Sequence, residues 1–184
     1  HTLALVNDAT GDQTVCVDDF KIAPSTGKWA IESWSYDGDS GVDPLYLYTH
    51  AYNFFSGASP VINGITFTGV SGVNPAVAGR FSTTYLGNGT GDGFNNISGN
   101  SAVMAAAFVY GGNVPANGYQ SISLQGLTPG ENYVVTVYSV AWEDPNVANR
   151  WVTYSVGNDY LTINQDQFYN NNGIRISYSY TADP

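Results

Sequence analysis

The chain has 184 residues, which is the size of one domain and enough to bury a sizeable core. Fifteen acidic residues against five basic ones give a formal net charge of −10, and so acidic a surface repels phosphate backbones and anionic lipids. No apolar run approaches the roughly 18 residues of a membrane-spanning helix. We therefore expect no nucleic-acid partner and no membrane insertion.

The surface polarity comes mainly from uncharged residues. Charged residues make up 11% of the chain, against about 25% in typical globular proteins, and Asn, Ser, Thr, Tyr and 21 glycines take their place. The single cysteine, Cys16, forms no internal disulfide and is expected to be a small buried apolar residue, with an intermolecular disulfide or a reactive thiol as the alternatives. This composition favours a secreted or cell-surface protein in its mature form.

The chain begins with two apolar, strand-like runs, residues 3–6 and 14–22, joined by residues 7–13. We expect them to form an N-terminal β-hairpin arm over residues 1–22. Residues 23–28 are predicted to be a linker, and residues 29–184 the body of the domain.

The body shows the period-2 alternation of β-strands, most clearly where Ile174, Ile176, Tyr178 and Tyr180 share one face. Residues 101–110 are predicted to form a buried strand, although their alanines also allow a helix, and residues 87–100 are predicted to form a mobile surface loop. Turn pairs such as Asn63-Gly64 and Pro129-Gly130 separate the strands. The other strands are expected at 29–35, 46–48, 65–68, 81–85, 119–124, 133–141 and 150–156. The fold class predicted is all-β, an antiparallel β-sandwich or jelly roll.

Residues 122–140 (ISLQGLTPGENYVVTVYSV) resemble the E–F corner of fibronectin type III modules. The resemblance implies that Leu127 packs inward, that Pro129-Gly130 makes the turn and that Tyr133 forms a tyrosine corner.

More broadly, residues 48–182 are similar to β-sandwich domains of bacterial cell-surface and secreted proteins, which are attached to carbohydrate-active enzymes or adhesive surfaces. The pieces that carry this similarity are VINGITF (61–67), GLTPG (126–130), YSVAW (138–142) and Asn149-Arg150. In that resemblance further strands follow the point where this chain stops. Residues 3–22 look like those strands placed at the front, so the strand order is expected to be permuted.

A strong last strand without a covering element leaves a sheet edge that another strand can pair with. We expect the N-terminal arm to cover such an edge, either in its own body or in a neighbouring copy. Donation to a neighbour is head-to-tail and need not close, so repetition generates a fibre. The predicted donor side chains are Leu3, Leu5, Val15, Val17, Phe20 and Ile22, and the acceptor-end strand carries Ile174, Ile176, Tyr178 and Tyr180. The function expected is a self-assembling, non-enzymatic subunit of an extracellular fibre.

Two further kinds of site are predicted in the loops. Asp37, Asp39 and Asp43 alternate with glycines, as in loops that bring several oxygens onto Ca²⁺, although a solvated acidic turn is the simpler interpretation. Asn88 and Asn96 begin N-x-[S/T] sequons and are candidate glycosylation sites.

Two alternative functions stay open. Trp34, Tyr36, Trp142 and Asn146 could form an aromatic platform for glycans, which would make the chain a carbohydrate-binding module, unless these aromatics fill the core. His1 and His50 resemble the copper-binding histidine brace of secreted lytic polysaccharide monooxygenases. The hydrolase, metalloprotease and P-loop motifs are missing, so we expect no enzyme.

Overall fold

The computed structural model describes residues 2–6, 19–23, 28–91, 95–111, 114–115, 118–140, 151–169 and 171–183. Strands dominate these residues, and the all-β class predicted from the sequence is confirmed. The helical elements in these ranges are short: η1 (Asp37–Asp39), a 3-10 turn, and α1 (Ser101–Ala105).

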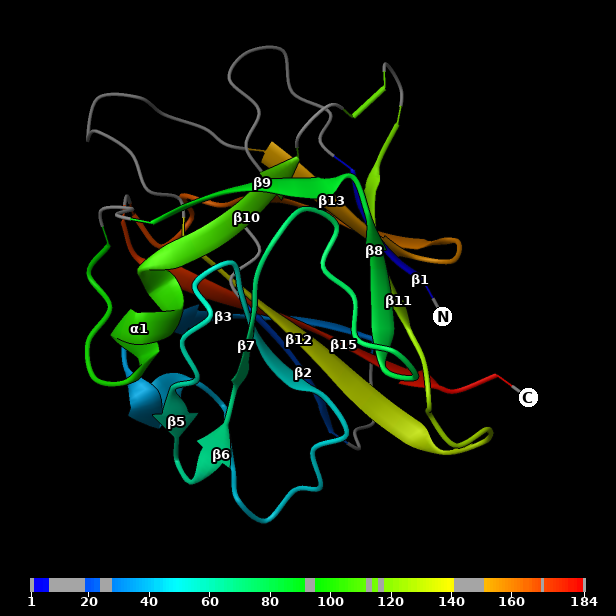
Figure 1. Cartoon of the computed structure of the whole chain (residues 1–184), viewed down its shortest axis with the longest axis horizontal. Helices are drawn as coiled ribbons and strands as arrows, with labels where there is room; N and C mark the ends of the chain where they lie inside the picture. The colour runs from blue at the N-terminus through cyan, green and yellow to red at the C-terminus, as the bar shows by residue number, and fades with distance from the viewer. Residues whose placement is uncertain are drawn as a thin grey trace.

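One sheet has five antiparallel strands in the order β14-β13-β1-β11-β8. Its members are β1 (Thr2–Val6), β8 (Phe81–Thr84), β11 (Gln120–Leu124), β13 (Trp151–Val156) and β14 (Asp159–Asn164). In Figure 1 the blue β1 lies between the orange β13 and the yellow-green β11, so the first strand of the chain is an interior strand of this sheet.

The second sheet has six strands in the order β3-β15-β12-β2-β4-β7, and the β4–β7 pair is parallel. Its members are β2 (Asp19–Ala23), β3 (Trp29–Trp34), β4 (Ala51–Phe54), β7 (Thr68–Val70), β12 (Asn132–Val140) and β15 (Gly173–Thr181). Two small ribbons complete the fold: β5 (Val61–Ile62) with β6 (Ile65–Thr66), and β9 (Leu86–Gly91) with β10 (Ala107–Gly111).

Both large sheets contribute to one buried cluster. Tyr154 and Ile122 come from the five-stranded sheet, and Val137 and Ile176 come from the six-stranded sheet; each is at most 2% exposed. Burial of each such side chain stabilises the fold by about 1.5–3 kcal/mol before entropy costs. This shared cluster is the main core.

A second cluster covers the other face of the six-stranded sheet. Trp34 and Tyr138 pack there with ring centroids 5.0 Å apart, under residues of α1 and of the β5–β6 ribbon. The Tyr138 hydroxyl donates a hydrogen bond of 2.6 Å to the Ser40 carbonyl, which ties the segment after η1 to the sheet. β12 is therefore buried on both faces from Tyr133 to Val140.

The structure contains the hydrogen bond between the Tyr133 hydroxyl and the preceding backbone that the predicted corner requires. The Tyr133 hydroxyl accepts a hydrogen bond of 3.0 Å from the Thr128 backbone N–H, and Leu127 packs against the main core. The Asn63-Gly64 turn also forms as expected, since both residues have positive φ, as a two-residue hairpin turn requires.

Four local predictions were wrong. β1 and β2 lie in different sheets and do not pair with each other, so they do not form the predicted hairpin. Residues 46–48 are not a strand, and the predicted loop at 87–100 begins with strand residues of β9. The predicted strand at 101–110 divides into α1 and β10, because Ser101 and Asn100 find a capping carboxylate in Asp37.

No helix among the described residues has both the length and the apolar character needed to span a membrane.

Candidate functional site

The predicted donor positions of β1 stand in register with buried residues on both sides. Leu3 is paired with Ile122 of β11 and Val156 of β13, and Leu5 is paired with Tyr154 of β13. Ile122, Val156 and Tyr154 are all buried. These rows cross the five-stranded sheet where its neighbouring strands contribute to the core.

The donor positions of β2 stand in equivalent rows of the other sheet. Phe20 is paired with Val137 of β12 and with Tyr52 of β4, and Ile22 is paired with Val135 of β12. All three partners are buried members of the main core. The remaining predicted donor residues, Val15 and Val17, lie outside the described residues, as does Cys16.

The predicted acceptor strand is not the direct neighbour of either N-terminal strand. β15 carries Ile174, Ile176, Tyr178 and Tyr180, and it pairs with β12 and β3. The strands that flank β1 and β2 are instead β11, β13, β12 and β4. The prediction missed them because alternation identifies a strand but not its partner.

The acidic loop uses its carboxylates to bind backbone N–H groups. The Asp39 carboxylate accepts hydrogen bonds of about 2.9 Å from the N–H groups of Ser35 and Tyr36, and Asp37 accepts a bond of 2.7 Å from Ser101. Asp43 accepts one of 2.9 Å from the Leu45 N–H. No group of three metal-ligating side chains converges anywhere in the described ranges, so the geometry gives the predicted Ca²⁺ site no support.

Trp34 is not available for the predicted glycan platform. Trp34 is fully buried against Tyr138 in the second cluster, so it cannot stack on a glycan. Tyr36 is 52% exposed, whereas Trp142 and Asn146 lie outside the described residues.

The histidine pair is likewise incomplete. His50 is buried, with Nδ1 2.9 Å from the Thr49 hydroxyl and Nε2 2.8 Å from the Arg80 carbonyl. Burial lowers the pKa of His50, so the ring is neutral near pH 7. Because hydrogen-bond partners stand at both ring nitrogens, His50 is poorly placed to bind copper, and His1 lies outside the described residues.

The two sequons stand in different settings. Asn88 lies in β9, paired with Tyr110 of β10. Asn96 is exposed, and its side-chain amide donates a hydrogen bond of 2.9 Å to the side chain of Asn172. The side chain of Asn96 is thus accessible, but it is already engaged in a surface contact.

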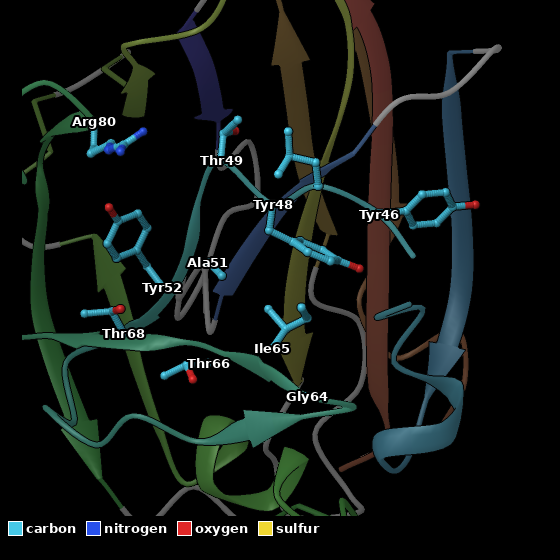
Figure 2. Close-up of a pocket in the computed structure, with 11 residues that line it drawn as sticks. Tyr46, Tyr48, Thr49, Ala51, Tyr52, Gly64, Ile65, Thr66, Thr68 and Arg80 are labelled. Carbon is cyan, nitrogen blue, oxygen red and sulfur yellow. The ribbon is translucent and has the colours of Figure 1, made fainter. Parts of the chain in front are cut away.

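A groove that the sequence analysis missed opens beside β4 (Figure 2). Its volume is about 430 Å³, within the roughly 300–1,000 Å³ usual for small-molecule sites. Eleven residues line it: Tyr46, Leu47, Tyr48, Thr49, Ala51, Tyr52, Gly64, Ile65, Thr66, Thr68 and Arg80. None of them is acidic, although acidic residues outnumber basic ones three to one in the chain.

Figure 2 shows how the groove is arranged. Arg80 and Tyr52 lie at one end with the Tyr52 hydroxyl toward Arg80, Tyr48 and Ile65 lie in the middle, and Tyr46 lies at the far end. Burial raises the pKa of the Tyr52 phenol, and the nearby Arg80 charge partly offsets that rise. Tyr52 is therefore a neutral hydrogen-bonding group beside a permanent cation.

The sequence analysis missed the groove because it predicted a strand at residues 46–48, whereas residues 46–49 form part of its wall. Their side chains line the groove because the Tyr48 hydroxyl donates 2.9 Å to the Asp43 carbonyl and accepts 2.8 Å from the Asp43 N–H, which closes a loop. The one sequence signal available was Arg80, one of only five basic residues.

No protein-family model, no curated protein and no solved structure matches this chain. The similarity to fibronectin type III corners and to bacterial surface domains therefore stays a prediction from the sequence.

Proposed function

We propose that this chain is a self-assembling subunit of an extracellular fibre, in which the N-terminal strands of one copy complete the sheets of the next. One observation carries the proposal: residues 2–23 supply an interior strand to each of the two large sheets. Two strands that occupy interior positions in different sheets without pairing with each other are well suited to exchange between copies.

The first argument is the size of the openings that β1 and β2 fill. Neighbouring strands lie about 4.8 Å apart, so removal of one interior strand leaves a slot about 9.6 Å wide. β11 and β13 would border one slot, and β12 and β4 the other. Each slot exposes two rows of unpaired backbone groups, which favours the addition of a strand from elsewhere.

The second argument is that β1 and β2 make no register pairs with each other. All of their partner strands come from residue 51 onward, so a second copy can supply the same pairs without loss. The choice between closure within one chain and donation to a neighbour then depends on the connecting segment and on concentration.

The third argument concerns the connection from β2 to β3. Ala23 stands opposite Val134, and Trp29 stands opposite Tyr178, so both ends lie at the same end of the sheet, three strand spacings apart. That distance is about 14 Å, and the six Cα–Cα steps between them reach about 20 Å. Closure within one chain therefore needs a largely extended connecting segment. This requirement reduces the advantage of self-closure over donation of the strands to a neighbour.

A disulfide trap tests the proposal directly. Ala4 of β1 and Ser155 of β13 are register partners, and such pairs come within the range of a disulfide. In a Cys16→Ser background, the double variant Ala4→Cys/Ser155→Cys should give a ladder of covalent oligomers on a non-reducing denaturing gel. Each single variant, as a matched control, should give dimers at most.

Electron microscopy of the full chain should show filaments that a chain lacking residues 1–23 does not form. If the double variant runs as a cross-linked monomer and the full chain shows no filaments, the strands close within one chain and the fibre proposal is wrong.

A further inference from the structure

We propose that the groove between residues 46–49, β4 and the β6–β7 segment binds a saccharide bearing a carboxylate, with Arg80 holding the acid group and the tyrosines contacting the sugar rings. This site is independent of strand donation, because none of its lining residues belongs to β1 or β2. A fibre subunit and a subunit that stays monomeric could each carry it.

The first observation is that the Arg80 guanidinium has no ion-pair partner within the described part of the chain. Lys28 pairs with Asp159 at 3.0 Å and Arg175 pairs with Glu32 at 2.6 Å. Arg80 is the remaining basic side chain that the structure describes, and no carboxylate in the described ranges pairs with it. In a chain of net charge −10, an exposed guanidinium with no acid partner among the described residues is a natural partner for an anionic group from outside.

The second observation is that the walls near Arg80 carry no competing charge. Among the described residues the groove has no acidic lining residue, Tyr52 is a neutral phenol, and His50, whose ring centroid lies 6.2 Å from that of Tyr52, is held neutral by burial. A guanidinium binds a carboxylate through two parallel N–H···O bonds, so one acid group satisfies its preferred geometry. The overall negative charge of the chain disfavours a long polyanion, so the favoured ligand is a short acidic saccharide.

The third observation is the chemistry of the remaining walls. Tyr46, Tyr48 and Tyr52 present aromatic rings, and Thr49, Thr66 and Thr68 add hydroxyls. Aromatic faces suit the apolar face of a sugar ring, and hydroxyls suit its polar edge. Tyr48 is held by its two hydrogen bonds to Asp43, so this wall is in place before a ligand arrives.

An acidic peptide is the competing occupant. Peptide recognition uses an exposed sheet edge or apolar pockets for alternate side chains. Six of the eleven lining residues here bear a hydroxyl, and Figure 2 shows them spread along the groove rather than around one deep apolar pocket. This distribution favours a ring-shaped, polyhydroxylated ligand.

Isothermal titration of the full chain with three probes tests the inference: trigalacturonic acid, neutral galactotriose and a short poly-glutamate peptide. We expect trigalacturonic acid to bind more tightly than galactotriose, and the peptide not to bind. Arg80→Gln should weaken binding of the acid sugar about 10- to 100-fold, the loss expected for a hydrogen bond to a charged group, and leave galactotriose unchanged. Tyr46→Ala should weaken both sugars.

Lys28→Gln is the matched control, because it removes the same charge at the opposite edge of the six-stranded sheet. It should leave all three titrations unchanged. Equal loss in both variants, absence of binding of either sugar, or tighter binding of the peptide would each overturn the inference. Arg80 is exposed and its contacts to His50 and Gln125 use the backbone carbonyl, so the variant keeps them.

Discussion

The acidic loop offers the sharpest test of the structure. Asp37 comes from η1, yet its carboxylate accepts hydrogen bonds from the N–H groups of Ser101, the first residue of α1, at 2.7 Å and of Asn100, the N-cap residue, at 3.2 Å. The helix has no side-chain cap of its own. Asp37→Ala therefore removes the cap and detaches the loop from the helix.

The expected cost of Asp37→Ala is about 1–2 kcal/mol, which is the usual cost of losing an N-cap. For a chain of this length that corresponds to a fall in melting temperature of about 2–8 °C. Glu131→Ala is the matched control, since this exposed acid has the same charge, and its change in stability should stay within about 0.5 kcal/mol. Thermal unfolding followed by circular dichroism measures both.

Calcium gives the same experiment a second outcome. The carboxylates of Asp37 and Asp39 already accept backbone N–H groups, so millimolar calcium should leave the melting temperature of the wild-type chain unchanged. A calcium-dependent rise in the wild-type chain that is lost in Asp37→Ala or Asp39→Ala would refute this account and restore the metal site.

Two further predictions concern buried tyrosines. Tyr138→Phe keeps the ring but leaves the buried Ser40 carbonyl without its hydrogen-bond donor, so the free energy of unfolding measured by urea titration should fall by about 1–3 kcal/mol. Tyr160→Phe, at an exposed position, is the control and should change the free energy of unfolding little. Equal effects of the two variants would contradict the role of this hydrogen bond. Burial, helped by the hydrogen bond to Asp159, raises the pKa of Tyr178 to about 12, whereas the pKa of a tyrosine in the unfolded chain is about 10. The unfolded state therefore releases this proton first, and stability should fall as the pH rises from about 10 to about 12. Tyr178→Phe should flatten that fall in urea midpoints measured across this range, and an unchanged slope would contradict the assignment.

Local patterns predicted the strands well where one face is polar and the other apolar. β13 and β15 alternate between buried and partly exposed positions, and the sequence shows the same period. The corner at Tyr133 and the turn at Asn63-Gly64 were predictable because their chemistry lies within a few residues.

Contacts between distant segments could not be predicted in this way. The helix α1 depends on a cap from Asp37, 64 positions away, so its alanines alone did not decide between helix and strand. β9 is rich in Gly and Asn, which individually disfavour strands, yet it pairs along β10. The partners of β1 and β2 also depend on tertiary structure, since alternation carries no information about the neighbouring strand.

The candidate groove shows the same limit. Its walls come from residues 46–52, the β6–β7 segment and Arg80, which are separate in the sequence. Trp34 illustrates the converse case, because an aromatic residue that the sequence placed on a surface platform is fully enclosed by the second cluster.

The position of β1 has a consequence for the time course of folding. Leu3 is synthesised 153 positions before its partner Val156. Strand pairs so far apart in sequence form slowly, because the entropy cost of closing a long loop comes before any stabilising contact is made. During this delay the N-terminal strands are available to any neighbour whose slots are open. A high local concentration of newly made chains would thus favour joining between copies over self-closure, and slow dilution during refolding would favour the closed monomer.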